Sequence, residues 1–490
     1  YKDKKRRCTV LSVGIGNTEL IMYTYTKNSE IFIMKQGVGI SIVLFFSIHC
    51  LGFAQSDCTC LSSLDSLSHK ISLNYAGYED KVNEKTRNHY ERMVQELRAL
   101  ASKSPSRRAC FELLARYVNF FEDKHLQIGD YNPDDFTRIY EPFTEKDARQ
   151  LLRNASAESP EGIWIEPSGE KKLAILKDGK RSGAFKALVI ESSDPNFKPG
   201  QLYYRLQNRG GFYEVESFGS ALLSAKSRGK HYKNLFYNYG PWMRQYPHQP
   251  NLAEQREFEA WKNNGKGLMC YKMTDSVVFL KIPTFGMQGN QLENFINKYD
   301  SLIRATPYLI VDVRHNGGGN IGMELLLPYL CSEPFVVKGG LMKSSDDNNR
   351  AFESDYAGDT VLVRRLRQNL GKLVSQPDLS LQYEPLPNPK KVVILQNDQC
   401  GSATEYSLQI VKNFKKVTTM GGFTMGMMDY GDLRGPADLP CRDFKCVIPM
   451  VKSPWTDTEP IDRTGIKPEV RILLPEYEWP ARAVEYLQGN

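Results

Sequence analysis

Residues 392–414 read VVILQNDQCGSATEYSLQIVKNF, the most informative segment of the chain. The apolar run at 392–395 is typical of a buried strand, and a helical pattern follows at 404–414. Similar apolar runs occur at 277–282 and 308–313, with a helical stretch at 291–304 between them. Strands that alternate with helices predict an α/β core.

Gly401-Ser402 stands at the predicted junction of strand and helix. A serine there exposes its hydroxyl at the helix N-terminus, and the backbone N–H of Ala403 has no intrahelical acceptor. That N–H could therefore bind a developing oxyanion, which makes Ser402 a candidate nucleophile. The G-x-S-x-G pattern of a nucleophile elbow is absent. The alternative is that Ser402 is simply a helix N-cap.

The segment YLIVDVRHNGGGN, residues 308–320, is a strand that runs into three glycines. Glycines allow close approach of the backbone and present N–H groups to a ligand. A phosphate-binding loop would continue with G-K-[ST], but Asn320-Ile321 follows here, which disfavours nucleotide binding. A second oxyanion donor, from Gly317 or Gly318, is the better interpretation.

These two segments resemble the core of tail-specific (C-terminal processing) and tricorn-like serine peptidases. That family carries a D-x-R-x-N-x-G-G loop and a later S-A-x-E motif. VVFLKIPTF, GGFTMG and RTGIKPEV resemble three further family motifs in the same order, so the resemblance covers roughly residues 270–475. It implies a crotonase-like ββα peptidase core. It also implies hydrolysis of a polypeptide substrate through an acyl-enzyme.

The family uses either a lysine or a histidine as general base. The lysine branch places its lysine about 25 residues after the serine, but residues 418–444 contain none and the first is Lys445. FFEDKHLQI, residues 120–128, resembles the short D-x-H segment of the tricorn-like branch, which implies that His125 is the base. A histidine suits the role because it exchanges a proton near neutral pH. His315, in the glycine loop, is the alternative.

The resemblance places a third catalytic residue, an acid, just before the closing motif. Asp462 and Glu459 both lie there, and the choice between them stays open, with Asp462 preferred. The alternative for each of these two residues is that it is an ordinary carboxylate in a solvated loop. Glu405 matches the glutamate of the serine motif, and it could also simply favour the helix N-terminus.

The chain divides into segments of different character. Residues 34–54 resemble a signal peptide, with a basic start, a short apolar run and small residues near Ala54, rather than a membrane anchor. Residues 236–250 look like a loop or linker, and residues 335–388 form a polar insertion in the core. We expect an upstream extension (1–33), a signal peptide (34–54), a helical domain (55–125), a β-rich domain in the place of a PDZ domain (126–255) and a peptidase core (256–490).

Composition excludes several classes of protein. Hydrophobic residues make up 41% and charged residues 25%, an ordinary globular balance. Much of the net charge of +7 lies in residues 1–35, and without a basic stripe nucleic acid is a disfavoured partner. There is no C-x-x-C pair and no H-E-x-x-H motif, so we predict no metal and no organic cofactor. The oligomeric state is not set by the sequence.

Cysteines suggest where the protein works. Export would permit disulfides, and Cys441 and Cys446, which flank the short segment RDFK, are the predicted pair. Cys58 and Cys60 could join Cys110. The alternative is that these thiols are free and buried.

The sequence therefore predicts an exported, periplasmic or extracellular serine endopeptidase. A catalytically inactive binding protein on the same scaffold is the first alternative, because a fold alone does not prove catalysis. An esterase is the second.

Overall fold

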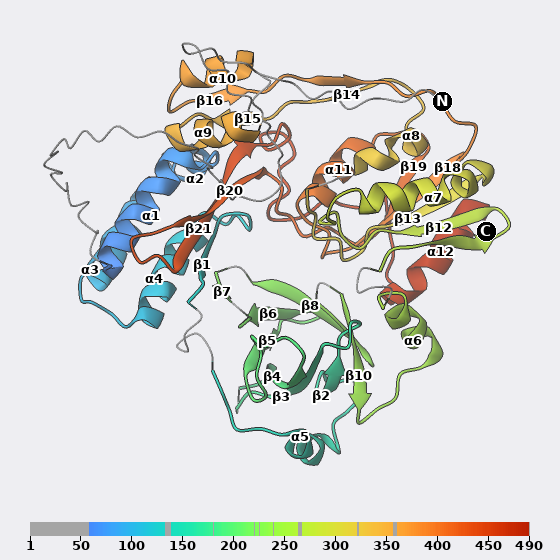
Figure 1. Ribbon diagram of the computed structural model, residues 1–490, viewed down its shortest axis with the longest axis horizontal. Coiled ribbons are helices and arrows are strands. Elements are labelled where there is room, and N and C mark those ends of the chain that lie inside the picture. Colours follow the sequence, from blue (N-terminus) through green and yellow to red (C-terminus); the bar gives the residue numbers. More distant parts are fainter. Residues whose placement is uncertain are drawn as a thin grey trace, which may run out of the picture. The chain divides into compact units, whose positions relative to one another are not determined.

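The predicted strands lie side by side in one six-stranded sheet of the computed structural model (Figure 1). The strand order is β11 (Met269–Thr274), β12 (Val277–Lys281), β13 (Tyr308–Asp312), β18 (Lys391–Gln396), β19 (Val417–Gly421) and β22 (Val470–Arg471). β11 runs antiparallel to β12, and every other neighbouring pair is parallel. This arrangement confirms the predicted strands and the α/β class.

The structure describes residues 58–132, 139–179, 181–219, 221–224, 226–238, 240–262, 267–320, 323–355 and 360–489. The upstream extension and the signal peptide expected at 1–54 lie outside these residues. Residues from Ser56 to Asn490 form one compact unit. Within the described ranges, no helix combines the length and the apolar character that a membrane crossing requires.

Helices flank the sheet and build the N-terminal part. They are α1 (Cys60–Asn74), α2 (Tyr78–Lys81), α3 (Arg87–Ala101), α4 (Arg107–Asn119), α5 (Glu145–Leu152), α6 (Leu252–Glu259), α7 (Gln291–Ala305), α8 (Leu327–Leu330), α9 (Asp346–Asp355), α10 (Thr360–Arg367), α11 (Ala403–Val411) and α12 (Trp479–Gln488), with short 3-10 turns η2 (Met323–Leu326) and η3 (Glu476–Glu478). The helical patterns predicted before residue 121 correspond to α3 and α4.

Both faces of the main sheet are buried. Side chains alternate between the two faces of a strand, so neighbouring residues serve different layers. Leu309 and Ile394 pack on the face covered by α7 and α11. Ile310 and Val393 pack on the opposite face, under α12. Burial on both faces explains why these strands read as continuous apolar runs rather than as alternating patterns.

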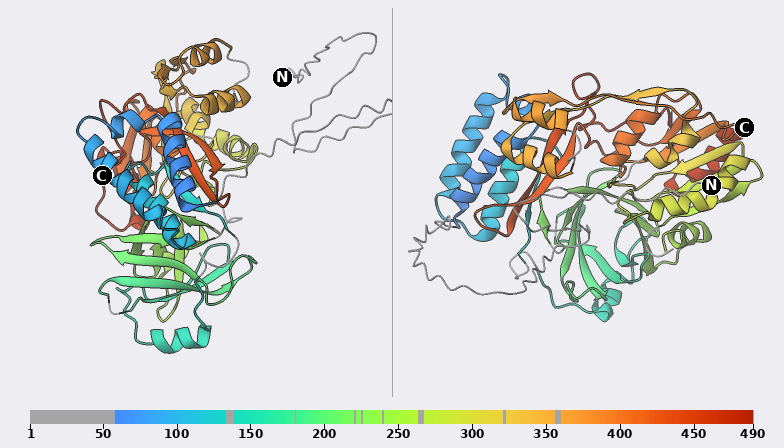
Figure 2. Two further views of the ribbon diagram at one scale, coloured as in Figure 1. Left: turned by 90° about the vertical axis from the view of Figure 1, so that its left-hand side faces the viewer. Right: turned by 45° about the horizontal axis from the view of Figure 1, so that its top comes forward.

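A second, antiparallel sheet joins segments from distant parts of the chain. Its order is β16 (Leu373–Ser375), β15 (Leu341–Lys343), β21 (Phe444–Lys452), β1 (Gln127–Asp130) and β7 (Leu222–Leu223), and β20 (Tyr430–Asp438) also pairs with β21. Helices α1 and α4 pack against β21 and β1 (Figure 2). Since β1 follows His125 directly, its pairing with β21 fixes that histidine beside the C-terminal part of the chain.

The cysteines pair differently from the sequence-based prediction. Cys441 forms a disulfide with Cys58, 383 positions earlier, and Cys60 pairs with Cys110. The predicted Cys441–Cys446 disulfide is wrong, because Cys446 lies within β21, opposite Ile128 and Ala437, and is a buried free thiol. Cys441 instead lies in the turn before β21, beside the start of α1.

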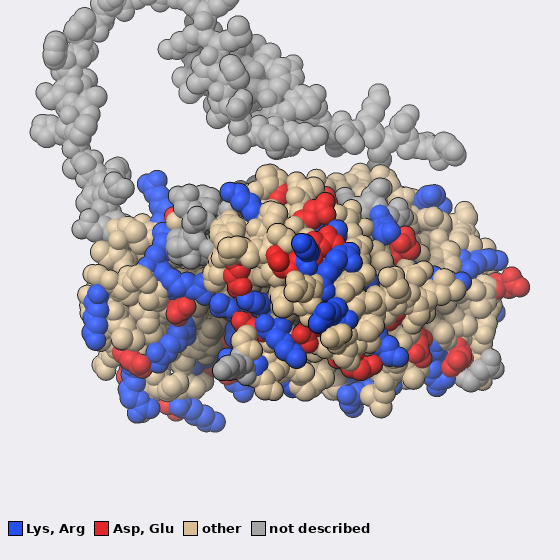
Figure 3. All heavy atoms as spheres, turned by 90° about the horizontal axis from the view of Figure 1, so that it is seen from below, with Lys and Arg blue, Asp and Glu red and all other residues tan. Residues whose placement is uncertain are grey.

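The β-rich part forms a closed barrel. Its order is β10 (Pro241–Tyr246), β2 (Gly162–Ile165), β3 (Lys171–Lys177), β4 (Ala184–Ser192), β5 (Leu202–Asn208), β6 (Tyr213–Ser217), β8 (Ser227–Tyr232) and β9 (Leu235–Tyr237). Trp164, Leu206, Phe236 and Trp242 pack in its interior. The loop expected at 236–250 is therefore wrong in its first part, where aromatic residues fill the barrel. On the face seen in Figure 3, basic and acidic side chains are scattered among other residues.

The insertion at 335–388 carries structure of its own. It holds β14 (Phe335–Val337) paired with β17 (Leu379–Leu381), and also β15, β16, α9 and α10. Phe352 of α9 and Leu362 of α10 pack with Met342 and Met450 of the second sheet. The insertion thus stands beside the C-terminal ends of β13 and β18, where ligands bind in open α/β sheets.

Candidate active site

Ser402 has the backbone conformation of a nucleophile elbow. It lies between β18 and α11 with φ 53° and ψ −125°, a strained combination for a residue with a side chain. Its side chain makes no capping hydrogen bond to the helix. The N-cap alternative therefore does not account for this serine, and its hydroxyl is available for chemistry.

The glycine loop meets the elbow at Gly318. This residue has φ +99°, and a Cβ on it would lie 2.8 Å from Ala403 N and 2.8 Å from Ser402 Cβ, so only glycine fits. Gly401 N–H also donates to the carbonyl oxygen of Asn316 (3.1 Å). The structure thus brings together two segments that lie far apart in the sequence and that were both predicted to form the site.

The predicted oxyanion donors differ in availability. The N–H of Gly318 donates to Asn316 Oδ1 (2.9 Å), so it is already engaged. Ala403 is the first residue of α11, where helix geometry provides no acceptor for its N–H. Gly317 is exposed beside them. Ala403 and Gly317 are therefore the better pair of donors.

A cleft of about 920 Å³ opens over Ser402 and Ala403. Gly319 contributes to one wall, and Leu379 of β17 and Leu433 of β20 to others. Its volume is large enough for several residues of an extended peptide.

His125 is buried, with 2% of its surface exposed, between α4 and β1. Its Nδ1 lies 2.7 Å from the carbonyl oxygen of Tyr430. A carbonyl only accepts hydrogen bonds, so Nδ1 carries the proton and Nε2 keeps its lone pair, as a general base requires. Among the described residues, no hydrogen-bond partner reaches Nε2. Burial lowers the pKa of His125, although Asp123 and the Tyr430 carbonyl raise it in part, which favours the neutral ring.

One loop connects the His125 segment to the elbow. Lys124 donates to the carbonyl oxygens of Met425 (2.6 Å) and Gly426 (2.7 Å). From the other side, Glu405 of α11 accepts from the N–H groups of Gly426 (2.6 Å) and Met427 (3.0 Å). Loop 424–427 is thus held both by the neighbour of His125 and by the first turn after Ser402.

Glu405 is a buried anchor rather than a partner of the helix dipole. Its carboxylate also accepts from Thr424 Oγ1 at 2.5 Å, and it is 0% exposed. Burial raises its pKa to about 6, against the lowering effect of these hydrogen bonds.

The two candidate acids lie in different surroundings. Glu459 forms an ion pair with Lys412 (2.6 Å) and its side chain is 65% exposed. Asp462 is buried: its Oδ1 accepts from Asp429 N–H (2.9 Å), and its Oδ2 has no partner among the described residues. Burial raises the pKa of Asp462 to about 8, and the charges of Asp123 and Asp429 add to that shift.

Neither candidate acid bonds to the imidazole, because the Tyr430 carbonyl takes Nδ1. The carboxylate beside His125 is Asp123, whose Oδ1 accepts the backbone N–H of His125 (2.8 Å) and whose Oδ2 accepts from Tyr75 (2.8 Å). The D-x-H segment contains Asp123, but the sequence alone predicted no role for that residue. It had no signal for Tyr430, which acts through its backbone.

The two rival bases are occupied elsewhere. His315 is buried, with Nδ1 2.9 Å from Gln399 Oε1 and Nε2 3.0 Å from Glu476 Oε2, so neither ring nitrogen is free to take a proton from Ser402. Lys445 lies on β21 in an ion pair with Asp438 (3.3 Å). Across the described ranges, no group of three or more His, Cys, Asp or Glu side chains is arranged to hold a metal ion.

Comparison with known families identifies this core. Residues 276–472 match the profile of peptidase family S41. The match supports a serine peptidase core of this family in residues 276–472, as the resemblance predicted. Comparison with curated proteins gives no match.

Solved structures with a similar course of the chain are distant in sequence. A structure described as a peptidase from Parabacteroides merdae is 12% identical and has a TM-score of 0.45, with 88% of this chain and 97% of that chain covered. Mature CPAF is 14% identical (TM-score 0.46; 88% and 96% covered). The photosystem II D1 C-terminal processing protease is 13% identical (TM-score 0.37; 85% and 94% covered). With TM-scores below 0.5, these likenesses support no argument about the site.

Proposed function

We propose that this peptidase cleaves polypeptides through an acyl-enzyme on Ser402, with His125 as the general base. The observation that carries the proposal is the strained conformation of Ser402 against Gly318, beside the free N–H of Ala403. A strained backbone conformation of this kind persists only where the surrounding structure enforces it, and such residues cluster at active sites.

We infer the following steps. Ser402 Oγ attacks the scissile carbonyl carbon and passes its proton to His125 Nε2. The N–H groups of Ala403 and Gly317 stabilise the oxyanion. The leaving amine takes the proton from His125, and a water molecule, deprotonated by the same nitrogen, hydrolyses the ester. The Tyr430 carbonyl holds the required tautomer throughout.

Asp462 remains the preferred third member of the triad. Its buried Oδ2 is free for a partner, whereas Glu459 is bound to Lys412 near the surface. Asp123 supports the same histidine from the backbone side. We assign Asp462 in its ionised form, which its pKa of about 8 favours only at alkaline pH, to stabilise the imidazolium at a distance rather than through a bond to Nδ1.

Labelling and turnover test the assignment together. We expect Ser402→Ala to abolish labelling by a fluorophosphonate, and Ser402→Ala and His125→Ala each to lower kcat/KM for a peptide substrate by at least about 10³-fold. His69→Ala, at an exposed position of α1, is the matched control and should be unaffected. A folded wild-type protein that is neither labelled nor active would favour the binding-protein alternative. Turnover of esters without peptides would favour the esterase.

We also propose that the protein is exported. Two disulfides support this, because such bonds persist in oxidising compartments. The signal-like segment at 34–54 supports it as well. Recovery of the protein from the periplasm or medium, with a mature N-terminus near Gln55, is the expected result. Recovery from the cytoplasm with both disulfides reduced would contradict it.

A further inference from the structure

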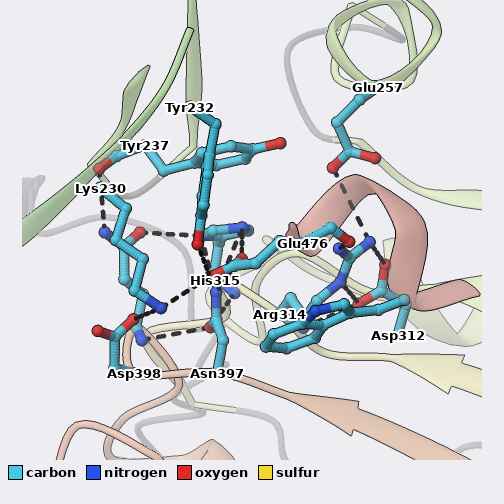
Figure 4. Close-up of polar contacts among 12 residues, drawn as sticks. Lys230, Tyr232, Tyr237, Glu257, Asp312, Arg314, His315, Asn397, Asp398 and Glu476 are labelled. Carbon is cyan, nitrogen blue, oxygen red and sulfur yellow. Dashed lines mark hydrogen bonds and ion pairs between the residues drawn. The ribbon is translucent and has the colours of Figure 1, made fainter. Parts of the chain in front are cut away.

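A buried cluster of polar side chains lies where the barrel meets the peptidase core (Figure 4). Its members come from the barrel, from α6, from the ends of β13 and β18, and from η3. They are Lys230, Tyr232, Tyr237, Glu257, Asp312, Arg314, His315, Asn397, Asp398 and Glu476. The proposed mechanism uses none of them.

Glu476 is the centre of one half of the cluster. Its side chain is fully buried, and its Oε1 accepts from Lys230 of β8 (2.8 Å). Its Oε2 accepts from Asn397 Nδ2 (2.7 Å) and lies 3.0 Å from His315 Nε2. Burial opposes ionisation, but Lys230 and His315 outweigh it and hold the pKa of Glu476 well below its ordinary value. This carboxylate thus joins a barrel lysine to both catalytic loops.

Asn397 ties those two loops to each other. It directly follows β18, shortly before Ser402, and its Oδ1 accepts from the N–H of His315 (3.0 Å) and of Gln399 (3.2 Å). His315 itself precedes Gly317 in the glycine loop and has φ 66°, a conformation that non-glycine residues seldom adopt. Several polar contacts therefore fix the backbone conformation of the loop that carries Gly317 and of the elbow that carries Ser402.

The barrel reaches the elbow through Gln399. Its Nε2 donates to the carbonyl oxygen of Arg228 on β8 (2.6 Å) and lies 3.3 Å from that of Tyr237 on β9. The ring of Tyr237 stacks on His315, with centroids 4.5 Å apart and planes inclined by 9°. Lys230 also pairs with Asp398 (2.9 Å), next to Gln399. Each contact joins a barrel strand to a residue within a few positions of the catalytic groups.

The other half of the cluster consists of ion pairs on the side of the peptidase core, in which each charge has an opposite partner. Arg314 pairs with Asp312 (2.7 Å), and Lys281 pairs with Glu257 of α6 (3.2 Å). Arg314 also donates to the backbone carbonyl of Glu476 and helps to lower the pKa of its carboxyl group, while Lys230 is the cation from the barrel that pairs with that carboxylate. A buried ion pair of this kind contributes little net stability but is costly to break, which suits a device that fixes geometry.

We propose that Lys230 and Glu476 are positioning residues, through which the barrel holds the glycine loop and the Ser402 elbow in their catalytic arrangement. The barrel is then part of the catalytic machinery rather than a substrate-binding appendage. This inference rests on the proposed function of Ser402. It predicts that weakening the barrel contact lowers turnover without any change at a residue that touches substrate.

The first experiment compares Lys230→Met with Lys226→Met. Lys226 lies just before the same strand, but its ion pair with Glu214 is exposed and has no link to the elbow. We expect Lys230→Met to lower kcat at least tenfold with little change in KM, per molecule of folded protein, and Lys226→Met to change neither. Hydrogen exchange of peptides covering 313–320 and 397–406 should accelerate in Lys230→Met alone. Unchanged kcat and unchanged exchange would overturn the proposal.

A second set of variants tests the proposal even if Lys230→Met does not fold. Lys230→Met combined with Glu476→Gln and Asp398→Asn leaves none of the three charges unpaired, so this triple variant should fold even if Lys230→Met does not. Its kcat should stay low, since the link is still broken. Full recovery of kcat would show that the pair only balanced charge and would overturn the proposal. Gln399→Met, which removes the contact to Arg228 without touching a charge, should lower kcat in the same way.

Hydrogen exchange also distinguishes a failure of this inference from a failure of the proposed function on which it rests. If wild-type protein is folded but neither labelled nor active, the proposed function fails and with it the catalytic consequence. Exchange measured in the Ser402→Ala background would then support the barrel-to-loop coupling if Lys230→Met accelerates it, and would overturn the coupling if it does not.

Discussion

Asp462 holds a carboxylate in surroundings that disfavour its charge. It is buried, one oxygen has no partner among the described residues, and Asp123 and Asp429 lie near. Its pKa of about 8 exceeds the ordinary 3.8 of the unfolded chain. Between those values the folded protein keeps a proton that the unfolded chain has released. The free energy of unfolding contributed by Asp462 therefore falls as pH rises from about 4 to about 8.

We expect Asp462→Asn to remove this loss. The amide keeps an oxygen for the Asp429 N–H but carries no charge, so the variant should be more stable than wild type at pH 8, by at least about 1 kcal/mol, and nearly equal near pH 4. Thermal melts at both pH values measure this, with Asp275→Asn, in an exposed turn, as the control. Activity should fall in the same variant if Asp462 stabilises the imidazolium. Equal melts at both pH values would contradict the raised pKa.

Candidate site residues could be named from the sequence only where a side chain carries the proposed chemistry. Ser402 stands in a strand-turn-helix pattern that can be read from the sequence, and His125 lies in a short motif. Tyr430 supports His125 through a backbone carbonyl 305 positions away, and every residue has such a carbonyl. The choice between Asp462 and Glu459 depended on burial, which loop sequences of similar composition do not reveal.

At the scale of elements, α11 does more than present Ser402. Its first turn ends in Glu405, which gathers Thr424, Gly426 and Met427 into one loop. Lys124, next to His125, donates hydrogen bonds to the same loop. The relative position of Ser402 and His125 therefore depends on α11, on loop 424–427 and on the segment that follows α4.

Glu405→Gln should weaken this link. An amide offers one acceptor oxygen where the carboxylate offers two, so one of the N–H groups of Gly426 and Met427 loses its partner. An unsatisfied buried donor costs about 1–3 kcal/mol. We expect a loss of stability of that size, measured by urea unfolding, and a lower kcat. Glu293→Gln, in the first turn of α7 but exposed, should change neither. A variant with wild-type stability and kcat would show that Glu405 does not hold the loop.

Elements were predicted well where one pattern dominates. The strands of the main sheet are buried on both faces, and their continuous apolar runs were unambiguous. The segment at 236–250 mixes aromatic and polar residues because β9 and β10 have one face inside the barrel. That alternation is short and interrupted by turns, so it was mistaken for a loop.

At the scale of the whole molecule, the N-terminal part of the described chain is joined to the segment around β21. β1 pairs with β21, α1 packs on β21, and Cys58 is linked to Cys441. Such contacts between distant segments leave no local trace in a sequence. The predicted pairing of Cys441 with Cys446 used closeness in the sequence, whereas the actual partner lies close only in the fold, since connectivity cannot be deduced from spacing.

The Cys58–Cys441 disulfide should stabilise this closure. A bond across so long a loop restricts the unfolded chain strongly, and removing a native disulfide typically costs about 2–5 kcal/mol. We expect Cys58→Ser and Cys441→Ser to lose stability by similar amounts, and the double variant to lose no more than either, because both substitutions remove the same bond. Since β1 follows His125 and pairs with β21, the loss should also appear as a lower kcat at temperatures below the melting transition.

Cys446→Ser provides the contrast. It removes a buried thiol but no cross-link, so it should leave the Cys58–Cys441 peptide intact in non-reducing mass spectrometry. Iodoacetamide should modify Cys446 in the unfolded wild-type protein without prior reduction, while Cys441 stays protected. A linked peptide joining Cys441 to Cys446 would refute the observed pairing. It would also mean that no disulfide joins Cys58, just before α1, to the turn before β21.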